Sequence, residues 1–321
     1  MKESFLIISL LINSFILMAQ DEAMIDIDKE TYEERNTEHL EEGWSVEGNI
    51  FPVVGQTAFN DNWIGRQPVD MTVGLTVSSA INYKKEKVII DNEVAAGYGI
   101  GATRLTDNDR SIRKISDHFE VNSILGSKIR RSQLYYSLAL NFKTQFNRGY
   151  QYKEDELGNE IKTERTHFFS PADIKLGPGI LYKKEEHFFV NVSPVAGRVT
   201  LVDRTFTEVD PLDEEALEHY ENHRYYGVEA NKSSLWEFGT AIRTFLKFDI
   251  VKNLSFSNSL ELYSNYLEAP QNVDLDYTAN LSLVVGKYLS TRVVFRMVYD
   301  DDAVGNLQIK EAFGIGANYQ F

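Results

Sequence analysis

The chain has 321 residues, a formal net charge of −15 at pH 7, 43% hydrophobic residues and no cysteine. An acidic chain argues against a nucleic-acid partner, because contacts to phosphate need clustered lysine and arginine. The lack of cysteine excludes a disulfide scaffold, a thiolate metal site and a cysteine nucleophile.

Residues 1–19 have the pattern of a secretory signal peptide. A basic start and a mostly apolar stretch over 5–18 precede the expected cleavage after Ala19. A membrane-anchoring helix is the alternative, but this stretch is shorter than the roughly 20 apolar residues that a helical span needs. Residues 20–43 are acidic and indicate a solvated periplasmic leader, with a plug that enters the barrel as the alternative.

From Trp44 onward, apolar and polar residues alternate with a period of two, which is typical of strands with one dry face. In residues 273–285 every odd position is apolar or aromatic, whereas the even positions from 274 to 282 are Asp, Thr, Asn and Ser. The segment 307–321 repeats the pattern. Similar segments start near Trp44, Met71, Val88, Phe119, Leu134, Ile174, Phe188, Trp236, Leu254 and Leu289. The sequence therefore predicts about 12 strands.

Short and long connections alternate between these strands. The short ones are 84–87, 128–132, 183–187, 251–253 and 286–288, and the long ones are 57–68, 105–117, 147–172, 203–234, 267–272 and 300–306. Outer-membrane barrels show this asymmetry between their two ends. A soluble sandwich or lipocalin-like barrel is the alternative, but its strands cluster near about 5–6 residues, and spanning strands need about 9–11.

The prediction is an all-β, up-and-down antiparallel transmembrane β-barrel of about 12 strands over residues 44–321. We expect it in the bacterial outer membrane, in contact with outer-membrane lipid. Aromatic residues gather near the predicted strand ends, as they do at bilayer interfaces. These aromatics are Tyr83, Phe248, Tyr288 and Phe321 at the short turns and Phe146, Trp236, Tyr266 and Tyr299 at the long connections.

Several short motifs occur in a fixed order along the chain. They are Asn62-Trp63, Tyr135-Tyr136-Ser137, Thr144-Gln145-Phe146, Gly149-Tyr150, Ser170-Pro171, Gly179-Ile180, Ser193-Pro194, Asn265-Tyr266 and Tyr299-Asp300-Asp301. In this order they resemble a family of uncharacterised outer-membrane β-barrel proteins from Bacteroidota, known as a domain of unknown function. The resemblance extends over roughly residues 44–321. It implies a barrel in a Gram-negative outer membrane, and it carries over no catalytic or ligand residue.

Charged residues on the polar face of the strands should line the lumen, because side chains alternate between the two faces of a strand. The candidates are Glu237, Arg243, Lys247, Glu261, Asp274, Asp276, Arg292, Arg296 and Lys310, together with Asp91, Glu93, Lys143 and Lys175. Both signs are present, whereas a selective pore tends toward rings of one sign. Salt bridges that fill a narrow lumen fit the mixture at least as well. A twelve-strand barrel allows either arrangement.

The short turn 251–253 fixes a register for two of these strands. Matching their apolar faces sets Arg243 opposite Glu261 and Lys247 opposite Ser257. The same reasoning sets Arg292 opposite Ser282 and Arg296 opposite Thr278, with Asp276 diagonal to Arg296. Arg243→Glu is then expected to destabilise the barrel, and Glu261→Arg in the same chain to restore much of the loss.

The chain shows no constellation typical of catalysis or metal binding. His167 and Ser170 share a loop, but no Gly-x-Ser-x-Gly motif or oxyanion-hole signature accompanies them. His219 and His223 could share a helix face, yet a zinc site needs three or four ligands. The sequence therefore predicts no catalytic residue, no metal site and no cofactor.

Pro178 and Pro194 lie within predicted strands, where each removes one ladder donor. They predict bulges or strand breaks.

Three functions remain open. The first is passage or binding of a small solute through a narrow lumen, and the second is a structural or accessory barrel that contacts another envelope protein. The third is a hydrolase in the lumen or at the rim. Lumen width separates the first two, and a converged Ser–His or metal cluster would favour the third.

Overall fold

The structure is a computed structural model that describes residues 42–62, 71–106, 109–155, 160–185, 187–286, 288–300 and 305–321. The predicted signal peptide (1–19) and most of the predicted leader (20–43) lie outside these residues and stay predictions. Residues 40–321 form one compact unit. Within the described part of the chain, no helix is long and apolar enough to cross a membrane.

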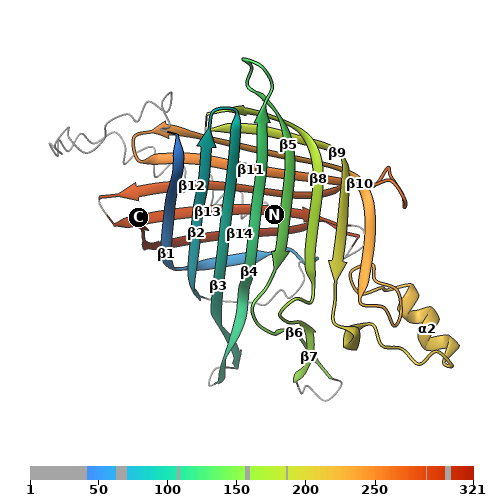
Figure 1. Ribbon diagram of the computed structural model, residues 1–321. Coiled ribbons are helices and arrows are strands. Elements are labelled where there is room, and N and C mark those ends of the chain that lie inside the picture. The colour runs from blue at the N-terminus through green and yellow to red at the C-terminus, as the bar shows by residue number, and fades with distance from the viewer. Residues whose placement is uncertain are drawn as a thin grey trace. The chain divides into compact units, whose positions relative to one another are not determined.

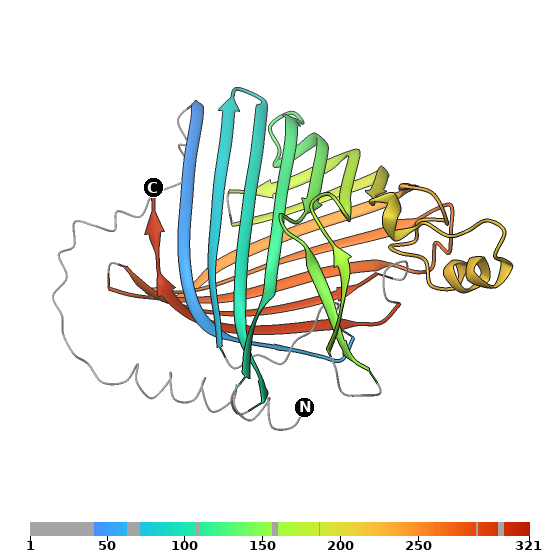
Figure 2. The same cartoon turned by 90° about the horizontal axis from the view of Figure 1, so that it is seen from below.

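Twelve antiparallel strands close into a barrel (Figure 1, Figure 2). They are β1 (Gly43–Phe59), β2 (Met71–Lys85), β3 (Val88–Thr106), β4 (Asp109–Lys128), β5 (Leu134–Thr144), β8 (Ala172–Lys184), β9 (Phe188–Leu201), β10 (Ser234–Val251), β11 (Leu254–Asn265), β12 (Asp274–Val285), β13 (Leu289–Tyr299) and β14 (Gln308–Ala317). Each strand pairs with the next, and β14 pairs back to β1. A short β15 (Tyr319–Gln320) also pairs with β1. The predicted fold class is confirmed.

One predicted long connection is wrong. Residues 105–117 were expected to be a loop because they are rich in polar and charged residues, but β3 runs on to Thr106 and β4 starts at Asp109. The two strands stay paired as far as Thr106 and Asp109, so strand structure extends through this polar stretch. Near the base of the β3–β4 hairpin, the Arg113 side chain pairs with Glu160 and lies over the ring of Tyr152, 4.0 Å from its centroid.

The longer connections carry folded elements at one end of the barrel (Figure 1). Strands β6 (Gly149–Glu154) and β7 (Glu160–Thr166) form a separate two-stranded sheet between β5 and β8. The β9–β10 connection holds a 3₁₀ turn, η2 (Arg204–Phe206), and a helix, α2 (Glu214–Glu221). The Asp213 side chain caps α2 by accepting a hydrogen bond from the Ala216 N–H. These folded elements form the long-loop end of the barrel.

The outer wall of the barrel exposes large apolar side chains. Those with more than a third of their surface exposed include Trp44, Val73, Leu75, Leu125, Leu138, Leu176, Trp236 and Phe238. Aromatic pairs mark both ends of this wall. Trp44 packs on Tyr83 at the short-turn end, and Phe238 packs on Tyr266 at the long-loop end, with ring centroids 5.0 and 6.3 Å apart. Many exposed large apolar side chains on one surface indicate contact with a membrane or with another protein.

Pro178 on β8 and Pro194 on β9 sit at one irregularity, as predicted. On β8, Leu176 pairs with Gly197 of β9 and Ile180 pairs with Val192, so three residues of β8 oppose four of β9. The same stretch is irregular against β10, between Gly239 and Ala241. The additional residue is a β-bulge in β9 at Pro194 and Val195. Such a bulge shifts the alternation of every later residue on its strand.

Candidate functional site in the barrel lumen

The register brings the predicted pairs together. Arg243 lies opposite Glu261 and Lys247 opposite Ser257 across β10 and β11. Arg296 lies opposite Thr278 and Arg292 opposite Ser282 across β12 and β13. The diagonal contact also forms, because two guanidinium nitrogens of Arg296 donate to the carboxylate of Asp276 at 3.1 and 2.8 Å.

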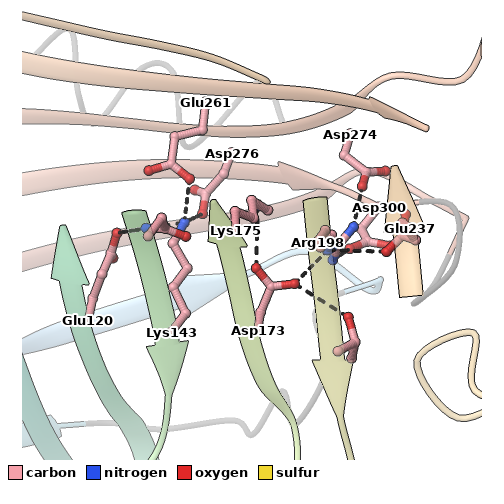
Figure 3. Close-up of polar contacts among 12 residues, drawn as sticks. Glu120, Lys143, Asp173, Lys175, Arg198, Glu237, Glu261, Asp274, Asp276 and Asp300 are labelled. Atoms are coloured by element: carbon pink, nitrogen blue, oxygen red, sulfur yellow. Dashed lines mark hydrogen bonds and ion pairs between the residues drawn. The ribbon is translucent and has the colours of Figure 1, made fainter. Parts of the chain in front are cut away.

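Lys143 connects opposite walls of the barrel (Figure 3). Its Nζ on β5 lies 2.7 Å from Oε2 of Glu261 on β11 and 3.1 Å from Oδ2 of Asp276 on β12. Glu120 on β4 is a third partner at 3.8 Å. Because β8, β9 and β10 separate β5 from β11 in the sheet, this side chain crosses the lumen. We call these four residues the Lys143 cluster.

Arg198 on β9 forms a second cluster, with four carboxylates (Figure 3). Its Nε lies 2.5 Å from Asp173 and 3.4 Å from Glu237, while Nη1 lies 2.7 Å from Asp274 and Nη2 3.0 Å from Asp300. The Arg198 side chain is only 10% exposed. Its partners come from β8, β10, β12 and the end of β13, so the guanidinium also ties distant strands together. These five residues are the Arg198 cluster.

The sequence reasoning missed three members of the Arg198 cluster. Simple alternation along β9 would turn Arg198 outward, but the bulge at Pro194 and Val195 turns it into the lumen. Asp173 precedes the expected strand start near Ile174, and Asp300 was counted as a loop residue. The prolines themselves were the available signal, because a bulge reverses the faces of the residues that follow it.

The remaining candidates are not brought into one site. Arg292 donates to Asn49 at 3.2 Å and lies over the ring of Phe51, 4.0 Å from its centroid. Lys310 lies 5.7 Å from the ring centroid of Phe59. Lys247 is exposed near the short-turn end. Of the nine predicted charges, four belong to the two clusters and three occupy these separate positions, while Arg243 and Arg296 pair with Glu261 and Asp276 of the Lys143 cluster.

Apolar side chains fill the lumen near the short-turn end. Ile89, Ile124 and Leu181 are buried together, and Tyr135, Ala139 and Phe189 pack against them. Phe189 stacks on Phe245 with ring centroids 5.8 Å apart. Most of these residues lie a few positions from short turns, on β3, β4, β5, β8 and β9. We call Ile89, Ile124, Leu181 and the residues packed on them the apolar floor.

His167 and Ser170 lie close together at the long-loop end but not as a nucleophile and base. Nδ1 of His167 lies 2.9 Å from Glu164, and its Nε2 lies 3.2 Å from Asp203. Ser170 is buried, and its hydroxyl accepts a hydrogen bond from the Asp203 N–H at 2.8 Å. Hydrogen bonds from the Thr205 N–H and hydroxyl hold the pKa of Asp203 below its usual value. The group therefore ties the β7–β8 and β9–β10 connections together.

The rings of the second histidine pair, His219 and His223, stack on each other. The rings of His219 and His223 lie 5.0 Å apart, and Nδ1 of His223 faces the backbone carbonyl of His219 at 3.1 Å. Among the residues that the structure describes, no group of three or more His, Asp or Glu side chains has the arrangement of a metal site.

Comparisons with known proteins bear on the fold more than on the site. Residues 54–150, less than a third of the chain, match a family described as a protein of unknown function (DUF3078). The predicted resemblance to a domain of unknown function is thus confirmed for that segment, while the Bacteroidota origin stays a prediction. No curated protein matches the chain by sequence.

Several solved outer-membrane barrels are similar in structure. The COG4313 outer membrane channel from Pseudomonas putida F1 has a TM-score of 0.38 and 7% identity, with 90% of this chain and 100% of that chain covered. The Salmonella typhi outer membrane phospholipase dimer with bound calcium has a TM-score of 0.38 and 10% identity, with 84% and 90% covered. These similarities are distant, so the twelve-strand assignment rests on the register of the strands.

Proposed function

We propose that this protein is an outer-membrane barrel that binds a small solute in its lumen and passes it across the membrane, and that the lumen is closed at rest. The observation that carries the proposal is the contact of Lys143 with both Glu261 and Asp276 across the barrel. An ion pair that spans the lumen narrows it to gaps between side chains. These ion pairs are also reversible, so a bound solute or an electric field across the membrane can displace them.

The apolar outer wall supports a membrane location. A bacterial barrel presents an apolar band to lipid, flanked by aromatic residues at both interfaces. Trp44 and Trp236 are 64% and 73% exposed and lie toward the two ends of the wall. Tyr and Trp favour such positions because one end of the ring system is apolar and the other can stay hydrated. We place the short turns on the periplasmic side and the long-loop end outside the cell.

A fractionation experiment tests this location. The mature protein should separate with outer membranes, resist carbonate extraction and migrate differently on a gel when it is not boiled. These results are expected because closure of β14 on β1 leaves no free edge along the barrel wall. Recovery in the soluble periplasmic fraction would contradict the location and the function together.

Conductance in a planar bilayer tests passage. The wild-type barrel should show low and rare conductance, and Lys143→Met should increase the open population, because three carboxylates lose the cation that joins them. If the substitution lowers the free energy that favours the closed lumen over the open one by about 1.4 kcal/mol, the open population rises about tenfold. Lys247→Met is the matched control, since this lysine is exposed near the short-turn end. If Lys143→Met conducts no more often than the wild type and the Lys247→Met control, the proposed passage is wrong.

An accessory barrel is the second candidate, and the folded outer connections favour it. The Tyr225 hydroxyl donates to the Arg165 carbonyl at 2.5 Å, and the Tyr225 ring stacks on Phe206 at 4.9 Å. Burial raises the pKa of this hydroxyl well above its usual value, so it stays a donor. Leu212 is 90% exposed beside α2. A rigid rim with an exposed apolar residue suits contact with another envelope protein.

We further propose that the barrel is not an enzyme. Both ring nitrogens of His167 face carboxylates, and Ser170 is buried as an acceptor from a backbone N–H. Neither residue is therefore placed to activate the other as a nucleophile. Hydrolysis of ester substrates by the purified barrel, lost in Ser170→Ala, would contradict this proposal.

A further inference from the structure

Two polar side chains lie on the outer wall of the barrel, at the seam where β1 and β14 meet (Figure 2). They are Gln56 on β1 and Glu311 on β14. Across the seam, Gln56 lies opposite Phe313 and Glu311 lies opposite Ala58, so the two polar residues are diagonal neighbours. Diagonal neighbours in an antiparallel pair are about 7–8 Å apart. Their long side chains therefore share one small area of the wall.

The alternation of the strands turns both side chains away from the lumen. On β1, Val54 has the same parity as Gln56 and is 49% exposed. On β14, Ile315 has the same parity as Glu311 and is 46% exposed. Lys310, the chain neighbour of Glu311, points into the lumen instead, where its Nζ lies 5.7 Å from the centroid of an aromatic ring of β1. In the proposed membrane location, both polar side chains face lipid.

A carboxylate is out of place on this surface. Glu311 is the one acidic residue on the outward faces of β1, β2, β12, β13 and β14, five strands that the structure describes in full. Its outward neighbours are Phe295 on β13 and Ile309 and Phe313 on β14. A charged side chain on the lipid face of a barrel is destabilising, most strongly near the middle of the bilayer. The position of Glu311 therefore calls for a partner.

Neither polar side chain has that partner in its own chain. Among the residues that the structure describes, Gln56 and Glu311 make no hydrogen bond and no ion pair, either with each other or with a third residue. Lys114 and Asp117 on β4 also face outward, but they neutralise each other at 2.9 Å. An amide and a carboxyl group without partners are unfavourable in lipid, so a partner from another chain would stabilise both.

We propose that a second copy of this chain packs on the β1–β14 seam, with Gln56 of each copy donating to Glu311 of the other. A two-fold axis brings the same patch of both subunits together, so each residue of a contacting pair is used twice. The seam suits such an axis because a donor and an acceptor lie side by side on it. A glutamine amide can donate to a carboxyl group whether or not that group carries a proton. Two contacts therefore satisfy four polar side chains.

The rest of the seam permits close packing. Ala58 lies opposite Glu311, so a small side chain leaves the carboxyl group accessible on the β1 side. Val54 lies opposite Ile315, and both are exposed next to the polar residues. In membranes, as between packed helices, small residues let two surfaces approach, and hydrogen bonds add to the packing because lipid supplies little hydrophobic driving force. This interface goes beyond the proposed passage and rests on the proposed membrane location.

Crosslinking through an introduced cysteine tests the interface. The chain has no cysteine, so Val54→Cys places a single thiol on the seam. In outer membranes that contain the full-length protein, a short bifunctional thiol crosslinker should give a product with twice the mass of one chain. Asn258→Cys is the matched control, because it replaces an outward amide on β11, three strands from β14. A doubled product no more abundant for Val54→Cys than for Asn258→Cys would overturn the inference.

Substitutions at the two polar residues identify the contact. Glu311→Leu and Gln56→Leu should each weaken association at least about tenfold, because either change removes both contacts of a two-fold interface. Sedimentation equilibrium of the full-length barrel in detergent micelles measures this, after the gel-shift test has shown that each variant is folded. Glu311→Gln should weaken association less than Glu311→Leu, since two glutamine amides can still bond each other. Unchanged association in both leucine variants would overturn the assigned contact.

The outcomes separate this interface from the proposed location and passage. Fractionation with outer membranes without a doubled product would overturn the interface alone. A crosslinked product of a different mass would come from another protein and would overturn the second copy as the occupant. Recovery in the soluble fraction would contradict the location and, with it, the interface.

Discussion

Arg198→Met should lower the free energy of unfolding by about 3–5 kcal/mol, the largest loss expected from any single substitution in the lumen. The reason is the number of carboxylates that one guanidinium joins, namely Asp173, Glu237, Asp274 and Asp300. Methionine fills a similar volume but supplies no charge. The four carboxylates then face one another in a largely buried space, where they are poorly screened by salt. Urea unfolding of the barrel in lipid vesicles measures the loss.

Two further substitutions show whether the loss comes from the geometry of Arg198. Arg198→Lys keeps one positive charge but lacks the planar guanidinium that contacts all four carboxylates, so part of the loss should remain. Arg148→Met removes an exposed arginine that pairs with Glu164 at 3.4 Å, and it should change stability by about 0–1 kcal/mol. A loss for Arg198→Met no larger than that of Arg148→Met would contradict the assigned role of the cluster.

The strands could be predicted from the sequence because one face of each must stay apolar. That requirement produces the alternation in residues 273–285, and β12 is observed over Asp274–Val285. It also fixes register across short turns, so the pairing of Arg243 with Glu261 followed from the turn at 251–253. Alternation failed over residues 105–117, because polar residues follow one another there without a period of two.

The contacts across the lumen could not be predicted in the same way. Lys143 is separated from Glu261 and Asp276 by 118 and 133 residues, and only the closure of the barrel brings them together. The sequence placed all three on the lumen side but contained no information on which strands oppose one another. The lumen position of Arg198 was not predicted for a local reason. One additional residue in β9 turns the Arg198 side chain to the opposite face of the strand.

The exchange of charge between Arg243 and Glu261 is the second large effect we expect, and the structure changes its predicted outcome. Arg243→Glu places a carboxylate near both Glu93 and Glu261, which lie 3.1 and 3.4 Å from the arginine in the wild type. The loss should be about 3 kcal/mol or more, because a buried pair is replaced by like charges. Unfolding in urea, in lipid vesicles, measures it.

Register alone predicts that adding Glu261→Arg restores much of this loss, but Glu261 has a second partner. Nζ of Lys143 lies 2.7 Å from the Glu261 carboxylate, whereas Nε of Arg243 lies 3.4 Å from it. An arginine at position 261 would therefore face Lys143 across the lumen. We therefore expect the double variant to recover less than half of the loss. A double-mutant cycle gives the coupling between the two sites directly. Ile242→Ser is the control, because this outward neighbour of Arg243 acts through lipid contact and should gain nothing from a change at 261. Full recovery in the double variant would mean that Glu261 serves Arg243 rather than Lys143, and the closed lumen would lose the contact that crosses it.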